Sequence, residues 1–105
     1  ATKVVMKFGG SSVRDAERIS EVCKLVSSQI AEGVRPHLVC SAMGKSTNNL
    51  LSAADRAVSK GEVDLSAMRT LHTETAATLG LETNPYYLDV CKLLDECERT
   101  LEGVA

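Results

Sequence analysis

Two short apolar runs, rich in β-branched residues, limit the fold of this chain more than any other feature. Lys3 to Phe8 reads KVVMKF and is followed by Gly9 and Gly10, while His37 to Ser41 reads HLVCS and follows Pro36. Runs of this length, bounded by turn-forming residues, are typical of buried strands. A segment with apolar residues at helical spacing separates them. The sequence therefore predicts a strand-helix-strand unit with parallel strands, in an α/β fold.

The helix between the two strands is expected to begin at Ser12. Asp15 follows three residues later, in a pattern that resembles a capping box, and Gly33 ends the helix. Its positive end then lies beside the turn that follows the first strand, where it favours an anion. The apolar positions that predict the helix are Ala16, Ile19, Val22, Cys23, Val26 and Ile30.

Helical patterns continue through the rest of the chain. Two apolar stripes end at Gly61 and Gly80, and Asn84 with Pro85 forms a good N-cap and first turn for a last helix. We expect that last helix not to end at Gly103 but to continue past Ala105. The stripes consist of Leu50, Leu51, Ala54, Ala57 and Val58; of Leu65, Met68, Leu71, Thr75, Ala76 and Leu79; and of Tyr87, Val90, Cys91, Leu94 and Leu101.

Length and composition exclude several classes of protein. The chain has 105 residues, of which 44% are hydrophobic, and its net charge is −2. This is the profile of one small globular domain, without the basic footprint of a nucleic-acid or anionic-lipid partner and without an apolar segment that could span a membrane. Because two parallel strands leave both sheet edges open, we expect the chain to be an incomplete piece of a larger sheet.

The four cysteines show no Cys-x-x-Cys pair, and the two histidines, His37 and His72, lie far apart in the sequence. We therefore expect reduced, buried thiols, no metal site and an intracellular, soluble protein. The cysteines are Cys23, Cys40, Cys91 and Cys97.

The segment after the first strand has the chemistry of a phosphate site. Gly9 and Gly10 let backbone N–H groups approach an anion, Ser11 adds a hydroxyl donor, and Lys7 can place an ammonium against phosphate oxygens. Transfer of a γ-phosphoryl group depends mostly on such positioning and charge stabilisation. The residues alone leave open the alternative of a plain strand-turn-helix connection with an incidental lysine.

The two strand ends together resemble a known family. KFGGSSV, followed by SAMGKSTNNLL after the second strand, is similar to the aspartate kinase branch of the amino acid kinase family, in particular to its plant-type monofunctional, lysine-sensitive members. The resemblance implies a three-layer αβα, carbamate kinase-like fold. Of that fold, residues 1–105 would supply the N-terminal βαβ unit and following helices of the catalytic domain, without a regulatory ACT domain.

The same resemblance implies a reaction. Such enzymes transfer a phosphoryl group from ATP, bound with Mg²⁺, to the side-chain carboxylate of L-aspartate, giving 4-phospho-L-aspartate in the first step of lysine, threonine and methionine biosynthesis. It further implies an allosteric homo-oligomer, in the plastid stroma of a plant or alga and otherwise in the cytoplasm. A piece of this size is expected to be inactive alone.

Roles for individual residues also follow from the resemblance. Ser41 and Thr47 match residues that contact aspartate, although Thr47 alone also fits a simple helix N-cap. Lys7 matches the residue that stabilises the transferred group. The residues that match the ATP-phosphate site are Lys7, Gly9, Gly10 and Ser11.

Other interpretations remain at this level. Gly44-Lys45-Ser46-Thr47 mimics the end of a Walker A loop, but that motif requires a glycine where Val39 stands. Lys45 is then a loop lysine near the substrate or a solvated side chain. A kinase for glutamate, uridylate or carbamate is the nearest enzymatic alternative. A non-catalytic helical interaction module is the alternative from another class.

Overall fold

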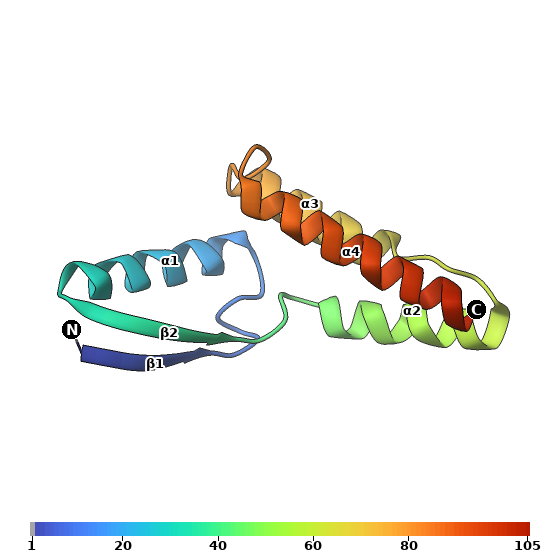
Figure 1. The fold of residues 1–105 in the computed structure, drawn as a ribbon, viewed down its shortest axis with the longest axis horizontal. Helices are drawn as coiled ribbons and strands as arrows, with labels where there is room; N and C mark the ends of the chain where they lie inside the picture. Colours follow the sequence, from blue (N-terminus) through green and yellow to red (C-terminus); the bar gives the residue numbers. More distant parts are fainter. Residues whose placement is uncertain (1) are drawn as a thin grey trace. The chain divides into compact units, whose positions relative to one another are not determined.

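The computed structural model describes residues 2–105, which form two compact units (Figure 1). The first unit extends to Gly44, and the second runs from Lys45 to Ala105. Within the described residues the chain is mixed α/β, with a two-stranded parallel sheet and four helices. The α/β fold class predicted from the sequence is confirmed.

The first unit is a βαβ unit, as predicted. It contains β1 (Thr2–Phe8), α1 (Ala16–Ala31) and β2 (Val34–Cys40). The strands pair in parallel, with Thr2 opposite Val34 and Phe8 opposite Cys40. Helix α1 lies along one face of this sheet (Figure 1). The carboxyl ends of both strands therefore meet at one edge.

The second strand is longer than the sequence predicted. It begins at Val34, and Pro36 lies within it, opposite Val4. A proline lacks the N–H that a strand donates, so strands that contain one belong at a sheet edge, where β2 lies. The interpretation of Pro36 as a boundary was wrong because the proline is compatible with an edge strand.

Helix α1 begins later than predicted. Its N-cap is Asp15, whose Oδ1 accepts a hydrogen bond of 2.9 Å from the Arg18 amide. The expectation that Ser12 caps this helix was wrong, because the Ser12 amide donates to the Gly9 carbonyl at 3.0 Å and closes a turn. Aspartate is among the best N-cap residues, and Asp15 places the start of the helix three residues later than Ser12 would.

The second unit is helical and contains α2 (Ser46–Lys60), α3 (Ser66–Thr78) and α4 (Pro85–Val104). Helix α2 packs against both α3 and α4. Two members of the predicted α2 stripe were wrong, because Leu51 and Val58 are exposed. The buried residues that form the core of this unit are Ala53, Ala57, Leu65, Leu94 and Leu101.

The ends of the helices in the second unit follow the sequence closely. The Asn84 side chain accepts a hydrogen bond of 2.9 Å from the Tyr86 amide, which confirms the predicted N-cap of α4. Gly61 adopts the left-handed conformation after α2, with φ of 65°. Helix α4 continues through Gly103, as expected.

An arginine joins α3 to α4. The Arg69 guanidinium lies 2.8 Å from Asp95 Oδ1 and 3.3 Å from Glu98 Oε2. The hydrogen bond to Asp95 is the main cause that raises the pKa of Arg69. These ion pairs connect two helices that are separated in the sequence by residues 79–84.

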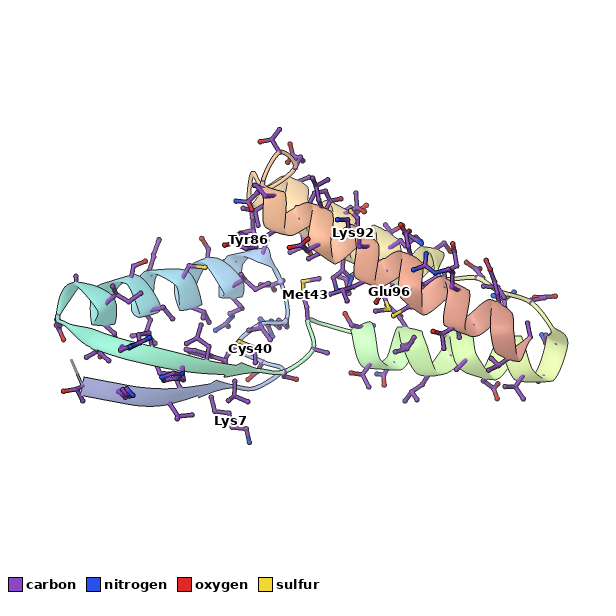
Figure 2. The ribbon with its side chains drawn as sticks, viewed as in Figure 1. Lys7, Cys40, Met43, Tyr86, Lys92 and Glu96 are labelled. Atoms are coloured by element: carbon purple, nitrogen blue, oxygen red, sulfur yellow. The ribbon has the colours of Figure 1, made fainter. Side chains whose placement is uncertain are left out.

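All four thiols are free, but the prediction that they are buried was wrong, since none of them is fully buried. Cys91 and Cys97 are half-buried, whereas Cys23 and Cys40 are exposed. One helix over two strands is too small to cover every apolar side chain of the first unit. Cys40, labelled in Figure 2, stands at the end of β2.

The helices of residues 2–105 include none with the length and hydropathy that a membrane-spanning helix requires.

Candidate functional site

The candidate site lies where the two strands of the first unit end. The register places Phe8 opposite Cys40, and one further bond continues the ladder, from the Ser41 amide to the Phe8 carbonyl at 2.9 Å. The loops that follow β1 and β2 therefore leave the sheet side by side. In parallel sheets, the crevice outside the carboxyl ends of the strands is where ligands bind.

A tight turn follows β1. The Ser12 amide donates to the Gly9 carbonyl at 3.0 Å, and neither Gly10 nor Ser11 has a positive φ. These properties match a type I turn, in which the two central amides take no part in the turn's own hydrogen bond. The N–H groups of Gly10 and Ser11 are thus free to donate to an anion, next to the exposed Ser11 side chain.

Lys7 is exposed and stands one residue before the end of β1. Figure 2 shows its side chain on the face of the sheet opposite α1, whereas the next residue, Phe8, is buried. Within residues 2–105 its ammonium makes no ion pair. The charge is therefore available to an anionic ligand at the strand end.

The helix terminus contributes less than the sequence suggested. Oδ1 of the Asp15 carboxylate accepts from the Arg18 amide, and Oδ2 lies 3.4 Å from Arg14 Nε. A carboxylate at a helix N-terminus already complements the positive end of the helix dipole. Helix α1 begins after the turn and is capped by Asp15, so its positive end lies farther along the chain from Gly9 and Gly10 than predicted and already has a carboxylate beside it.

Ser41 joins the turn to the second strand. Its hydroxyl is the nearest group to Gly10 on the side where a side chain would project, because a Cβ placed on Gly10 would lie 3.7 Å from Ser41 Oγ. Within residues 2–105, Ser41 makes no hydrogen bond besides the one from its amide to Phe8. The structure thus brings Gly10 and Ser41 together.

Thr47 belongs to the second unit, where it is an exposed residue in the first turn of α2. The N-cap position is taken by Lys45, which makes no side-chain capping bond. The alternative that Thr47 serves as an N-cap was wrong. Among the described residues, its hydroxyl therefore does not cap α2. Gly44 precedes this helix with φ of 52°, a conformation that favours glycine.

A hollow that the sequence did not indicate lies under the turn. Its volume is about 200 Å³, and its polar rim includes Ser12, Arg18 and Glu21. Arg18 Nη1 lies 4.0 Å from Glu21 Oε2, so this rim is partly neutralised. The apolar part is formed by Phe8, Val22 and Leu25.

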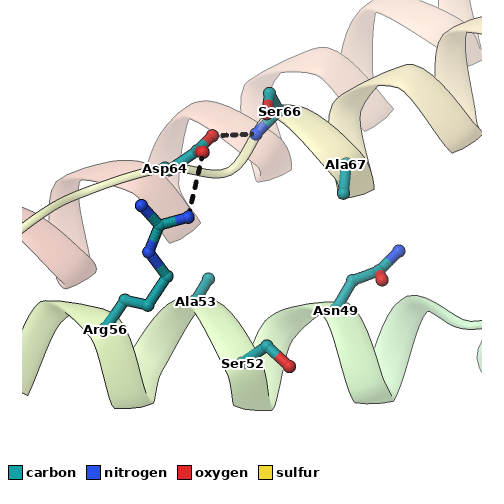
Figure 3. A pocket seen from close by; sticks show the side chains of 7 residues that line it. All are labelled: Asn49, Ser52, Ala53, Arg56, Asp64, Ser66 and Ala67. Carbon is teal, nitrogen blue, oxygen red and sulfur yellow. Dashed lines mark hydrogen bonds and ion pairs between the residues drawn. The ribbon is translucent and has the colours of Figure 1, made fainter.

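Two further hollows lie in the second unit. Figure 3 shows the smaller one, of about 110 Å³, where Arg56 lies 3.4 Å from Asp64 Oδ2. Asp64 also accepts from the Ser66 amide at 3.0 Å, and hydrogen bonds from Ser66 lower the pKa of the Asp64 carboxyl. Its charged groups thus satisfy one another. The larger hollow, of about 610 Å³, is mainly apolar and lies between α2 and α4.

A protein-bound metal finds no support in the described part of the chain. Between residues 2 and 105, His, Cys, Asp and Glu side chains form no group of three or more that could hold a metal ion. The candidate site is instead a set of hydrogen-bond donors. It consists of the ammonium of Lys7, the hydroxyls of Ser11 and Ser41, and the backbone amides of Gly10 and Ser11.

Comparison with known proteins gives consistent results. Residues 2–94 match the amino acid kinase family. The chain is 44% identical to aspartokinase 2, chloroplastic, and 43% identical to aspartokinase 1, chloroplastic, both from Arabidopsis thaliana, over 96% of its length. It spans only 19% and 18% of those two relatives. An aspartokinase from Thermus thermophilus is 43% identical over 50% of this chain and 13% of its own length.

Proposed function

The chain belongs to the amino acid kinase family, and we propose that it is the N-terminal part of the catalytic domain of an aspartate kinase. The proposal rests on the identity to plant aspartokinases over nearly the whole chain. Since the chain spans about a fifth of those relatives, the activity belongs to the complete protein. The exposed apolar side chains Val5 and Val39, on the uncovered face of the sheet, agree with a piece of a larger sheet.

The geometry that supports the proposal is the hydrogen bond from the Ser41 amide to the Phe8 carbonyl. It holds the turn after β1 beside the end of β2, so that the residues proposed to bind phosphate and the residue proposed to bind the acceptor carboxylate lie at the same end of the sheet. A kinase that phosphorylates a carboxylate needs both anions close together, with positive charge and N–H groups to offset their repulsion.

In the proposed reaction, an oxygen of the aspartate side-chain carboxylate attacks the γ-phosphorus of ATP. A new P–O bond forms, the bond to the β,γ-bridging oxygen breaks, and ADP leaves with the electron pair. Lys7 stabilises the charge that spreads over the transferred group, and the amides of Gly10 and Ser11 orient it. Ser41 and Thr47 donate to the acceptor. Mg²⁺, which enters with ATP, neutralises phosphate charge.

Further properties of the complete protein belong to the same proposal. Relatives named chloroplastic support a soluble enzyme of the plastid stroma. The aspartate pathway to lysine, threonine and methionine follows from the product, 4-phospho-L-aspartate. Feedback control by lysine and a homo-oligomeric state follow from the plant-type resemblance of the segment Ser41 to Leu51.

The test is direct detection of the product. The complete protein is incubated with ATP, Mg²⁺ and L-aspartate in the presence of hydroxylamine, which converts an acyl phosphate to a coloured hydroxamate. We expect hydroxamate with aspartate and little with glutamate or carbamate at equal concentration. Product with glutamate alone would assign the protein to another branch of the family. No product with any acceptor would contradict a catalytic function.

A further inference from the structure

Neither glycine in the turn after β1 is required by the backbone conformation. Positive φ values occur at Gly33, Gly44, Gly61 and Gly80, but not at Gly9 or Gly10. An alanine could replace Gly10, a central residue of the type I turn, because both central positions have negative φ, and it could replace Gly9, the first residue of the turn, whose φ is not positive either. The reason for a glycine must therefore be sought in the space beside it.

That space differs between the two glycines. A Cβ on Gly9 meets nothing within 4 Å, whereas a Cβ on Gly10 lies 3.7 Å from Ser41 Oγ. This is an ordinary van der Waals distance, so the methyl group fits, but it covers one side of the Ser41 hydroxyl. The Ser41 side chain is otherwise exposed. A glycine at position 10 thus leaves the Ser41 hydroxyl accessible on the side that faces the turn after β1.

We propose that Gly10 is a specificity-determining residue, whose missing side chain leaves room for the acceptor carboxylate to reach Ser41 Oγ beside the phosphate turn. The inference rests on the proposed aspartate kinase function. Gly10 then affects binding of the acceptor carboxylate, in addition to its proposed contact with the phosphates of ATP. A Cβ at position 10 would stand 3.7 Å from Ser41 Oγ, on the side of the hydroxyl that faces the turn, and would narrow the approach of a carboxylate oxygen from that side.

The test is a double-mutant cycle in the complete protein. The dissociation constant of L-aspartate is measured by calorimetry without nucleotide, so that the result does not depend on phosphoryl transfer. A hydrogen bond to a charged group changes binding about tenfold or more. We therefore expect Ser41→Ala to weaken aspartate binding about tenfold in the wild-type background, but less than about twofold in the Gly10→Ala background, where the added methyl group covers the side of the hydroxyl that faces the turn.

Gly9→Ala is the matched control, since a Cβ there meets no neighbour. In that background Ser41→Ala is expected to keep its full, roughly tenfold effect. Thermal unfolding followed by circular dichroism checks that each variant folds. An equal effect of Ser41→Ala in all three backgrounds overturns the inference while the kinase proposal stands. Absence of aspartate binding and of acyl phosphate in the wild-type protein overturns both.

Discussion

The amide of Ser41 donates a hydrogen bond of 2.9 Å to the carbonyl of Phe8, one residue beyond the last paired residue of β2. This bond fixes two loops that are far apart in sequence at the same edge of the sheet. Gly10, two residues after Phe8, is thereby held near the Ser41 hydroxyl, and Lys7 immediately precedes Phe8 on β1. Five of the six residues singled out from the sequence belong to this one unit.

Lys7 provides the sharpest test of the phosphate site. We expect Lys7→Ala to reduce kcat for aspartate phosphorylation in the complete protein about a hundredfold or more, because loss of a preorganised charge-stabilising donor costs on the order of 3 kcal/mol. Hydroxamate formation measures the rate. Lys3→Ala is the control, since Lys3 is an exposed lysine of the same strand. Equal rates in the Lys7 variant and wild type would remove Lys7 from the mechanism.

Thr47 tests the acceptor side. Thr47→Val preserves the shape of the side chain but removes its hydroxyl, and we expect the KM for aspartate to rise about tenfold because a hydrogen bond to a carboxylate is lost. Thr47→Ser retains the hydroxyl and is expected to restore most of the affinity. If valine and serine variants have the same KM, the hydroxyl does not contact the substrate.

Asn84 tests the last helix. Its side chain caps α4 through the Tyr86 amide, so Asn84→Ala is expected to lower the free energy of unfolding by about 1 kcal/mol. Urea unfolding of the complete protein measures the change. Asn84→Ser, which preserves a capping oxygen, serves as control. A destabilisation by serine as large as that by alanine would argue against the cap.

Leu94 and Leu93 are neighbours on α4 with opposite environments, since Leu94 is 5% exposed and Leu93 is 60% exposed. Leu94→Ala is expected to cost about 2 to 5 kcal/mol through a cavity in the core of the second unit. Leu93→Ala should change stability by no more than about 0.5 kcal/mol. The same urea titration compares them. Comparable losses at both positions would contradict the packing of α4 against α2.

Asp64 links stability to pH. Hydrogen bonds from Ser66 lower the pKa of this carboxyl in the folded state. The ionised form is thus favoured by folding, and its contribution is present above the unfolded pKa, about 4, and is lost as the pH falls through the lower folded value. We expect Asp64→Asn to lower the unfolding temperature at pH 7, with a smaller difference at pH 3. A difference independent of pH would show that ionisation of Asp64 is not involved.

The sequence alone predicted the βαβ unit and the last helix for identifiable reasons. The apolar runs before Gly9 and Ser41 predicted the strands, since short β-branched segments between turn residues favour extended backbone. The expected burial was wrong for most of their side chains, which are exposed. Asn84 with Pro85 predicted the start of α4, because the capping bond involves residues two positions apart and needs no tertiary contact. Local chemistry decides such features.

The start of α1 could not be predicted, because Ser12 and Asp15 are both good caps. Because Asp15 caps the helix, the Ser12 amide is able to donate to the Gly9 carbonyl and close the turn. The Asp15 carboxylate then occupies the helix terminus at which the sequence predicted a bound anion. Two local preferences competed here, and the path of the chain from β1 to α1 selected between them.

The sequence by itself determined which residue types are available to a phosphate: an ammonium at Lys7, and a turn of glycines and serines after a strand. Only the tertiary structure decided that Gly10 faces Ser41 and that neither Gly9 nor Gly10 needs a positive φ. The reason is physical. Strand and turn patterns depend on neighbouring residues, whereas the distance between two loops depends on the register of the sheet, which pairs Phe8 with Cys40.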